Sequence, residues 1–357
     1  MKNGNIAEAL AYQRDILPGV SRTFALTIPQ LPRELRTVVT NAYLLCRIAD
    51  TIEDDVNLSP AEVRQFQTRF IDILKKDSGA SGLVDELSPR LSVSTIPAER
   101  ELIANMEKVL LVTSTFNPSK QDVLVRCVEV MCEQMPIFQH AAKKEGLKSL
   151  HDLNHYCYAV AGVVGEMLTE LFCNYSDEIA MNYAGLMRLA PSFGQGLQMT
   201  NILKDVWDDL EADSCWLPRD VFAEAGYDLQ GLAPDHRRED FHQGLVRLIG
   251  IGHGHLKNAI DYSLLIPTHE TGIRRFLLWN VNMAVRTLKQ IYRNPDYVSG
   301  EEVKISRMSL LGTIVATNAA VRSDGLVQSL FGTFGRGLPL DSVDQGYFEE
   351  AAQLSSF

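Results

Sequence analysis

Two clusters of acidic residues have a spacing that could do metal chemistry. The first comprises Asp50, Glu53 and Asp54, followed by Asp55, and the second comprises Asp205, Asp208 and Asp209. In both clusters the acids occupy positions i, i+3 and i+4, which lie on the same face of a helix. Carboxylate oxygens suit hard cations such as Mg²⁺, which usually also contacts substrate phosphates. The spacing therefore predicts two helix faces that hold Mg²⁺ around a diphosphate.

A solvated helix end is the alternative interpretation of either cluster, and two features favour the metal site. Each cluster continues an apolar helical face, YLLCRIAD in the first case and GLQMTNILKDVWDD in the second, instead of lying in a polar run. Each also has a cation beside it, Arg47 three positions before Asp50 and Lys204 next to Asp205. Carboxylates for a metal together with flanking cations are what an anionic diphosphate requires.

Between the clusters, the stretch HYCYAVAGVVGEMLTELF begins at His155 and is mostly apolar. Small residues at positions 159, 162 and 165 share one helical stripe, although glycine inside a helix costs about 1 kcal/mol relative to alanine. The stripe predicts either the close approach of another helix or room for a long apolar substrate. In the second case Tyr156 or Tyr158 could offer a hydroxyl, or a ring face to a cation.

The elements that must position these residues are helices. Apolar side chains recur every three or four positions from Leu35 to Asp54, and the sequence SPAE from Ser59 is typical of a helix start. Further helical periodicity covers residues 98–116, 119–145, 150–173, 177–211, 235–263, 268–293 and 302–321. Strand-like alternation is almost absent and no Gly/Ser-rich linker divides the chain. We predict a single all-α domain over residues 1–357, with an irregular, glycine-rich tail from about residue 322.

Composition excludes several classes of protein. The 357 residues are 46% hydrophobic and 22% charged, which is typical of a globular protein and excludes a disordered or collagen-like chain. Acidic residues outnumber basic ones by 45 to 34, for a net charge of −11. Nucleic-acid binding needs clustered lysine and arginine, so no nucleic-acid partner is expected.

The cysteines and the N-terminus predict a cytoplasmic protein. The six cysteines are scattered among apolar neighbours without a CxxC pair, so we expect reduced, mostly buried thiols in place of disulfides or a zinc site. The N-terminal sequence MKNGNIAEALAYQRD lacks the apolar segment of a secretory signal. No window has the ~18 uninterrupted apolar residues expected of a spanning helix.

Three motifs resemble the squalene/phytoene synthase family, the head-to-head branch of the class I isoprenoid synthases. They are SRTF from Ser21 with YLLCRIADTIED from Tyr43, then YCYAVAGVVG from Tyr156, and QMTNILKDVWDD from Gln198. Together they extend to about Trp216 and follow the family's order. The resemblance implies a helical isoprenoid synthase fold around a central apolar cavity, Mg²⁺ on both acidic motifs, and condensation of two prenyl diphosphates.

The same resemblance implies roles for individual residues. One substrate loses its diphosphate to give an allylic cation, and the double bond of the other attacks it to form a cyclopropylcarbinyl diphosphate. Tyr156 matches the catalytic tyrosine position and Tyr43 matches a pocket position. The polar motif residues implied to contact diphosphate are Ser21, Arg22, Arg47, Gln198, Asn201 and Lys204. Aromatic faces would shield the cation, and a dry cavity would limit its capture by water.

The family divides at the cyclopropyl intermediate, which squalene synthases reduce with NADPH and phytoene or dehydrosqualene synthases convert by losing a proton. Three later segments are similar to the squalene synthase pattern, namely FLLWNVNMAVRTLKQIY from Phe276, VKISR from Val303 and ATN from Ala316. In that pattern the basic loop and the aromatic residue at the position of Phe276 serve the reduction. The resemblance implies that Lys304 and Arg307 contact the 2′-phosphate of NADPH, and a solvated loop is the alternative.

No dinucleotide fingerprint supports NADPH independently. The sequence GIGHGH from Gly250 lacks the third glycine of that fingerprint and follows no strand, so we interpret it as an interruption of a helix. The chain also departs from the family's usual residues at four positions, Lys204, Asp208, Ser214 and Ser306.

These observations lead to one hypothesis with two alternatives. The hypothesis is a Mg²⁺-dependent farnesyltransferase that makes squalene from two molecules of farnesyl diphosphate through presqualene diphosphate, with NADPH as reductant. The alternatives are a phytoene or dehydrosqualene synthase, and a non-catalytic helical prenyl-lipid binding protein. Because the hydrocarbon product is insoluble in water, we expect peripheral contact with a membrane surface. Candidates for it are the tail residues Phe331, Phe334, Phe348 and Phe357.

Overall fold

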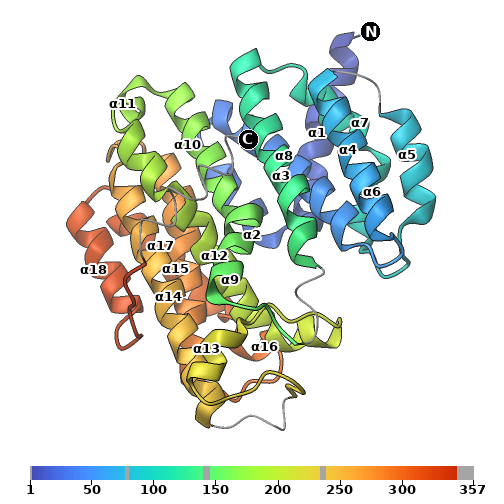
Figure 1. Cartoon of the computed structure of the whole chain (residues 1–357). Coiled ribbons are helices and arrows are strands. Elements are labelled where there is room, and N and C mark those ends of the chain that lie inside the picture. The colour runs from blue at the N-terminus through green and yellow to red at the C-terminus, as the bar shows by residue number, and fades with distance from the viewer. Residues whose placement is uncertain (1, 77–79, 140–144, 234–238, 344–357) are drawn as a thin grey trace. The chain divides into compact units, whose positions relative to one another are not determined.

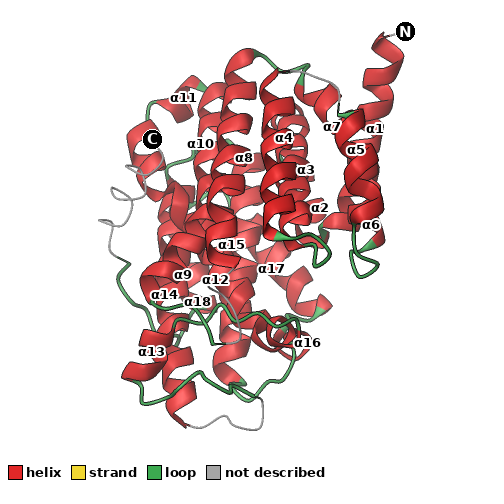
Figure 2. Cartoon of the chain, turned by 45° about the vertical axis from the view of Figure 1, so that its right-hand side comes forward, coloured by secondary structure: helices red, strands yellow, loops and turns green. Residues whose placement is uncertain are grey.

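Helices account for the regular structure of the chain in the computed structural model (Figure 1). The structure describes residues 2–76, 80–139, 145–233 and 239–343. Over these ranges it contains no strand, only an isolated parallel bridge between Leu147 and Pro218 (Figure 2). The all-α prediction is confirmed. The chain divides into two compact units, Met1–Pro136 with Glu170–Ser176 (unit 1) and Ile137–Thr169 with Asp177–Phe357 (unit 2).

Unit 1 is centred on two long helices, α1 (Lys2–Val20) and α3 (Arg33–Asp54), which pack against each other and against α7 (Met106–Thr113). Its other elements are α2 (Arg22–Thr27), a 3₁₀ turn (Ile28–Gln30), α4 (Pro60–Lys76), α5 (Ser81–Leu87), a second 3₁₀ turn (Ser88–Arg90), α6 (Pro97–Ala104) and most of α8 (Pro118–Gln139). The predicted start of α4 is confirmed, because Ser59 and Glu62 form a reciprocal capping pair.

A buried polar network joins the three central helices of unit 1. The amide of Asn41 on α3 is fully buried and donates to Gln13 Oε1 on α1 at 2.7 Å and to the Val109 carbonyl on α7 at 2.9 Å. The Thr113 hydroxyl donates in turn to Asn41 Oδ1 at 2.9 Å. Because an unpaired buried amide is costly, this network selects one packing of the three helices. The helix that carries the first acidic cluster is thereby held in place.

Unit 2 is centred on the 29-residue helix α12 (Tyr183–Glu211), which packs along α14 (Glu239–Leu264) and α15 (Thr271–Arg293). Its other elements are α9 (Leu150–Cys157), a π-helical segment (Tyr158–Gly162), the first half of α10 (Val163–Tyr175), α11 (Asp177–Ala180), α13 (Arg219–Glu224), α16 (Gly300–Val303), α17 (Arg307–Ala320) and α18 (Asp324–Phe334). The second acidic cluster lies at the C-terminal end of α12.

Glycines allow α12 to approach the segment that follows α9 at backbone contact. A β-carbon built on Gly194 of α12 would lie 1.8 Å from the Ala161 carbonyl oxygen in the π-helical segment. One built on Gly165 would lie 2.0 Å from the Ala190 carbonyl oxygen. Close helix approach, one of the two interpretations of the small-residue stripe, is therefore confirmed at Gly165. It positions Tyr156, at the end of α9, relative to α12.

The interpretation of GIGHGH as a helix interruption is wrong, because these residues lie inside the continuous helix α14. The chain beyond α18 packs against this glycine-rich face. Asp341 donates its backbone N–H to the Gly250 carbonyl at 3.1 Å, and a β-carbon on Gly254 would lie 2.3 Å from the Asp341 carbonyl oxygen. The glycines thus make room for a tertiary contact at the cost of some helix propensity.

The prediction of an irregular tail from about residue 322 is wrong for the residues that form α18. The Ser323 hydroxyl caps this helix by accepting from the Leu326 N–H. Val327 and Phe331, four positions apart, are both buried. The glycines of α18 face open space, so they lower its helix propensity without preventing helix formation once the apolar face is packed.

The structure describes two of the four aromatic residues that were proposed for membrane contact. Phe331 is 5% exposed and its ring lies 5.3 Å from that of His253, so it belongs to the core. Phe334 is half-buried, with the Arg286 guanidinium 4.9 Å from its ring. Phe348 and Phe357 lie outside the described residues.

One described stretch, Leu150–Tyr175, is long and apolar enough to cross a membrane by length and composition alone. Of its apolar window, 67% is buried inside the protein, as in the core helix of a folded domain. Five of the six cysteines are buried and Cys173 is half-buried, in agreement with the prediction of mostly buried thiols.

A matched pair of glycine substitutions tests the backbone contact. Gly194→Ala should lower the free energy of unfolding by about 3 kcal/mol, because the new methyl group meets a carbonyl that cannot rotate away. Gly332→Ala, on the open side of α18, should instead raise it by about 0.5–1 kcal/mol. Chemical denaturation of both variants measures the difference, and equal effects would contradict the proposed contact.

Candidate functional site

Arg47 is the centre of the charged cluster in unit 1. Its Nη1 lies 3.9 Å from Asp50 Oδ2 and 3.5 Å from Glu99 Oε1, and its Nη2 donates to the Tyr43 hydroxyl at 3.0 Å. Tyr43 donates to the Val20 carbonyl at 3.0 Å, which fixes its ring. Burial acts to lower the pKa of Arg47, but Asp50, Tyr43 and Glu99 outweigh it and raise that pKa. The guanidinium is therefore a permanent positive charge beside the first acidic motif.

The three predicted metal ligands of the first motif crowd one another at the end of α3. Glu53 is only 4% exposed, and burial, then Asp54 and Asp50, raise its pKa to about 9. Burial also raises the pKa of Asp50, against the opposing effect of Arg47. Asp54 is exposed at the last residue of the helix. Carboxylates in this arrangement destabilise one another unless a cation is present.

Asp55 has a different role from its neighbours. Its carboxylate accepts from the Ser92 N–H at 2.8 Å, from the Thr95 hydroxyl at 2.6 Å and from the Asn57 N–H at 3.0 Å. These bonds tie the end of α3 to the segment before α6. Asp55 is therefore a structural residue, whereas the three acids before it have the environment of a cation site.

Ser21 and Arg22 lie at the start of α2. The Ser21 hydroxyl accepts from the Phe24 N–H at 3.0 Å and caps the helix. Arg22 is exposed as the first residue of α2. The Phe24 ring centroid is 5.1 Å from that of Tyr43, so α2 is held beside the helix of the first motif. Of the predicted diphosphate contacts, Ser21 thus has a capping role and Arg22 is accessible to a ligand.

The second acidic motif in unit 2 is paired with its own lysine and with a backbone N–H. Lys204 donates to both carboxylate oxygens of Asp205. Asp208 Oδ2 accepts from the Gly300 N–H at 3.2 Å, and a β-carbon on Gly300 would lie 2.6 Å from Asp205 Oδ1. Burial, then Asp205, raise the pKa of Asp209 to about 7, with Lys204 opposing and Asp208 adding. A side chain at position 300 would displace these carboxylates from the N-terminus of α16.

Helical spacing places further predicted residues on the same side of α12. Gln198, Asn201, Asp205 and Asp208 follow one another at intervals of three or four positions, which share a helix face. Gln198 is half-buried and Asn201 is exposed. Unit 2 therefore presents an amide pair, an ammonium and carboxylates along one stripe of α12.

Tyr156 is stacked on Trp216, a partner that the sequence interpretation missed. The two ring centroids are 3.9 Å apart and the planes differ by 11°. The chain turns back toward α9 immediately after the second motif, where the Ser214 N–H donates to the Asp209 carbonyl at 2.9 Å. Tyr156 and the second acidic motif are thus joined through the short segment from Asp209 to Trp216. The tryptophan seven residues after the third family motif was the available signal.

The other aromatic candidates lie inside unit 2. Tyr158 is 3% exposed and donates to Glu166 Oε1 at 3.2 Å, so of the two tyrosines only the half-buried Tyr156 retains an accessible side. Phe276 is 1% exposed on α15, and its ring centroid is 6.4 Å from that of Phe193 on α12. The structure places Phe276 in the core that supports α12.

The predicted cofactor loop follows α16 and is exposed. Lys304 is paired with Glu301, and Arg307 is exposed as the first residue of α17. Ser306, where the family usually has a basic residue, caps α17 by accepting from the Ser309 N–H at 3.2 Å. The loop begins four residues after Gly300, which contacts the second acidic motif.

The two acidic motifs fit Mg²⁺ but are not closed metal cages. Among the described residues, no group of three or more His, Cys, Asp or Glu side chains gathers as a ready-made metal site. Mg²⁺ usually binds through one or two carboxylates and completes its shell with waters and substrate phosphates. The oxygen-only donors and their raised carboxyl pKa values suit an ion that arrives together with a diphosphate.

Comparison with known proteins supports the motif assignments. A family model described as squalene/phytoene synthase matches residues 17–309. Squalene synthase ERG9 of Candida albicans is 29% identical over 308 residues, which cover 80% of this chain and 62% of the relative. The Botryococcus squalene synthase of Botryococcus braunii is 29% identical over 300 residues, covering 82% and 60%. The chain thus spans about three fifths of the length of these relatives.

Solved structures show the same fold. A structure of TcSQS with a bound ligand superposes with a TM-score of 0.76 at 23% identity, covering 98% of this chain and 97% of that one. A dehydrosqualene synthase in complex with a ligand gives a TM-score of 0.65 at 19% identity, covering 90% and 100%.

The crowding of the first acidic motif predicts a pH-dependent stability effect for Glu53→Gln in the metal-free protein. Between about pH 4.5 and pH 9 the unfolded chain loses the Glu53 proton while the folded chain keeps it, so the wild type loses stability as the pH rises. Glutamine does not titrate. The variant should therefore gain stability relative to wild type by up to ~1.4 kcal/mol per pH unit.

Denaturant melts of the two proteins at several pH values measure this gain. Glu107→Gln, at an exposed position of α7, is the control and should show a constant difference from wild type. A Glu53→Gln difference that is also constant with pH would contradict the crowded site.

Proposed function

Because the chain belongs to the squalene/phytoene synthase family, we propose that it condenses two molecules of farnesyl diphosphate through presqualene diphosphate and reduces the product to squalene with NADPH. One observation carries the proposal. Each acidic motif combines crowded carboxylates with a cation in contact, Arg47 beside Asp50 and Lys204 beside Asp205. This composition suits a diphosphate bound together with divalent metal. Squalene synthase relatives of 29% identity support the choice of farnesyl diphosphate.

The two cations have different geometric abilities. Arg47 keeps its charge and is pre-oriented by Tyr43 and Glu99, so its guanidinium can hold phosphate oxygens in a fixed direction. Lys204 is a flexible point charge that can leave Asp205 for a diphosphate oxygen when that carboxylate takes a metal ion. Bound Mg²⁺ would supply Lewis-acid stabilisation of the departing diphosphate.

The stacked pair of Tyr156 and Trp216 suits the carbocation chemistry of the condensation. A ring face attracts a cation without a lone pair that would capture it. Trp216 covers one face of the Tyr156 ring at 3.9 Å, and the half-buried Tyr156 side chain keeps part of its surface accessible to a substrate. The acids of the third motif, joined to Trp216 through Ser214, are in the same unit.

The exposed loop after α16 suits a phosphorylated nicotinamide cofactor. NADPH would supply hydride to the cyclopropyl intermediate. Lys304 and Arg307 would hold its 2′-phosphate, and Lys304 would exchange its exposed partner Glu301 for that phosphate. The contact between Gly300 and the second acidic motif holds the loop near the carboxylates of α12.

A dehydrosqualene or phytoene synthase is the second candidate, and the role of Ser306 favours it. A position that is basic in the squalene synthase pattern is here committed to capping α17. The product would then form by loss of a proton, with no need for the loop. A non-catalytic prenyl-lipid binding protein is the third candidate and would release no diphosphate.

We also propose a cytoplasmic location with peripheral contact to a membrane, because the hydrocarbon product is insoluble in water. An apolar stripe on α17 supports it. Met308, Leu311 and Val315 are 77%, 56% and 60% exposed and share one helix face.

Substitution of the metal ligands tests the condensation step. Asp50→Asn and Asp205→Asn should each lower Mg²⁺-dependent diphosphate release from farnesyl diphosphate at least about 100-fold, because one charged oxygen ligand is lost. The control Asp122→Asn, at an exposed position of α8, should release diphosphate at the wild-type rate. Full activity in both ligand variants would contradict the metal-site assignment.

Product analysis distinguishes the three candidates. Incubation with farnesyl diphosphate and Mg²⁺ should give presqualene diphosphate alone without NADPH, and squalene when NADPH is added. Lys304→Ala should raise the ratio of presqualene diphosphate to squalene about tenfold through the loss of one charge-assisted phosphate contact, whereas Lys257→Ala, at a surface pair on α14, should not change it. A polyene formed with or without NADPH would identify the second candidate, and no product at all would favour the third.

A further inference from the structure

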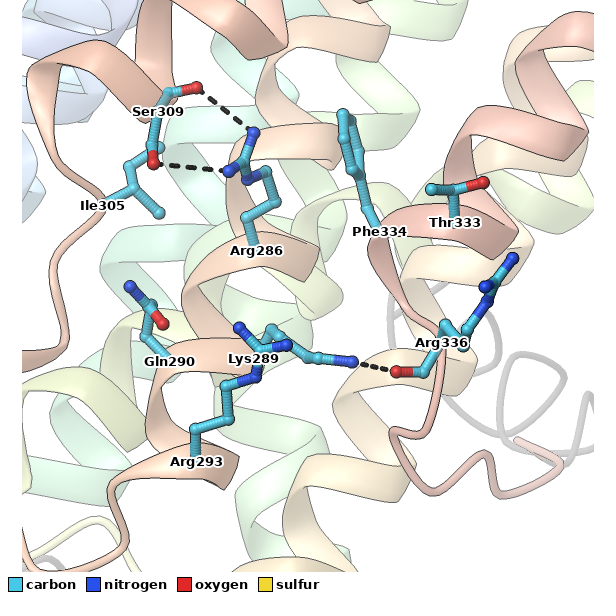
Figure 3. Close-up of a pocket in the computed structure, with 9 residues that line it drawn as sticks. All are labelled: Arg286, Lys289, Gln290, Arg293, Ile305, Ser309, Thr333, Phe334 and Arg336. Carbon is cyan, nitrogen blue, oxygen red and sulfur yellow. Dashed lines mark hydrogen bonds between the residues drawn. The ribbon is translucent and has the colours of Figure 1, made fainter.

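A basic pocket in unit 2 shares no lining residue with the acidic motifs, and the proposed mechanism uses none of its four cations. It has a volume of about 420 Å³, within the ~300–1,000 Å³ range of small-molecule sites. Figure 3 shows the residues that line it: Arg286, Lys289, Gln290 and Arg293 of α15, Ile305 in the loop before α17, Ser309 of α17, Thr333 and Phe334 of α18, and Arg336 just after α18.

The charge of this pocket is of one sign. Arg286, Lys289 and Arg293 follow one another at intervals of three and four positions on α15. Arg336 lies on the turn after α18, where its backbone carbonyl meets Lys289. None of the residues that line the pocket is acidic. In a chain with a net charge of −11, four cations without an acidic neighbour in the lining form a local site for an anion.

Two of the four cations, Arg286 and Lys289, are held in place before any ligand binds. Arg286 donates to the Ser309 carbonyl at 3.2 Å and to the Thr313 hydroxyl at 2.8 Å, and its guanidinium lies over the Phe334 ring. Lys289 donates to the Arg336 carbonyl. Pre-oriented donors lose little conformational entropy on binding, so these contacts favour a ligand.

The cations of the pocket repel one another in the free protein. Burial, and then the nearby Arg293 and Arg336, lower the pKa of Lys289. Among the described residues Arg293 and Arg336 form no ion pair with a carboxylate, and no acidic side chain lines the pocket. A bound anion would relieve this repulsion.

We propose that the pocket formed by Arg286, Lys289, Arg293 and Arg336 binds a small anion that carries two or more phosphate groups. Guanidinium forks match phosphate oxygens, and hydroxyl or amide groups of Gln290 and Thr333 can complete the contacts. Two sources share this chemistry, inorganic diphosphate and a phosphorylated dinucleotide. The second is relevant because Ile305, which belongs to the Lys304–Arg307 loop, forms one wall.

The test is a binding measurement without Mg²⁺ or prenyl substrate, so its result does not depend on the proposed condensation. Calorimetric titration of inorganic diphosphate into the full chain, in EDTA and at fixed ionic strength, should show saturable binding. The affinity should fall about tenfold for Arg293→Gln or Arg336→Gln and further for the double variant, since each loses one charge-assisted contact. Arg322→Gln removes an exposed cation outside the pocket and should bind as the wild type does.

Competition identifies the source of the phosphate. Displacement of diphosphate by NADP⁺ would assign the pocket to a dinucleotide, and failure of NADP⁺ to displace it would assign the pocket to free diphosphate. Circular dichroism checks that the variants are folded. If the double variant does not fold, the two single variants test the proposal. The proposal is overturned if the wild type does not bind diphosphate, or if the double variant binds it as tightly as the wild type.

Discussion

The backbone contact between α12 and the segment that follows α9 is the constraint on which unit 2 depends. Gly194 meets the carbonyl of Ala161, and Gly165 meets that of Ala190, so neither helix can shift without a clash or a gap. The π-helical turn at Tyr158–Gly162 lies at this contact, and such turns often occur at functional sites. This contact fixes the position of Tyr156, which stacks on Trp216, relative to the carboxylates of α12.

The carboxylates of the acidic motifs are unfavourable for the stability of the folded chain. A glutamate with a pKa of about 9 and an aspartate with a pKa of about 7 are poor core residues, because burial and like charges oppose their ionisation. Arg47 and Lys204 compensate only in part. In the proposed function, a bound divalent metal and a diphosphate would relieve the remaining cost. Asp55, with three hydrogen bonds of its own, contributes to stability at the same helix end without sharing this conflict.

Two glycine-rich stretches in the C-terminal region were predicted to be irregular and are helical. Glycine-rich stretches usually indicate loops, yet α14 is continuous through GIGHGH and α18 is a helix. In the first case the missing side chains admit the backbone at Asp341, and in the second an apolar stripe at Val327 and Phe331 supplies the packing that propensity lacks. The buried Arg274 then binds Asp324 at 2.6 Å and secures α18 to α15.

The sequence by itself determined the helical class, the side-by-side placement of carboxylates within each acidic motif, and the nearby cations, because these follow from local periodicity and short spacing. Only the tertiary structure decided which groups outside the motifs join them: Glu99 with Arg47, Trp216 with Tyr156, and Gly300 with the carboxylates of α12. Those partners are distant in sequence. Their contacts depend on how helices pack, which the spacing of residues within one helix does not specify.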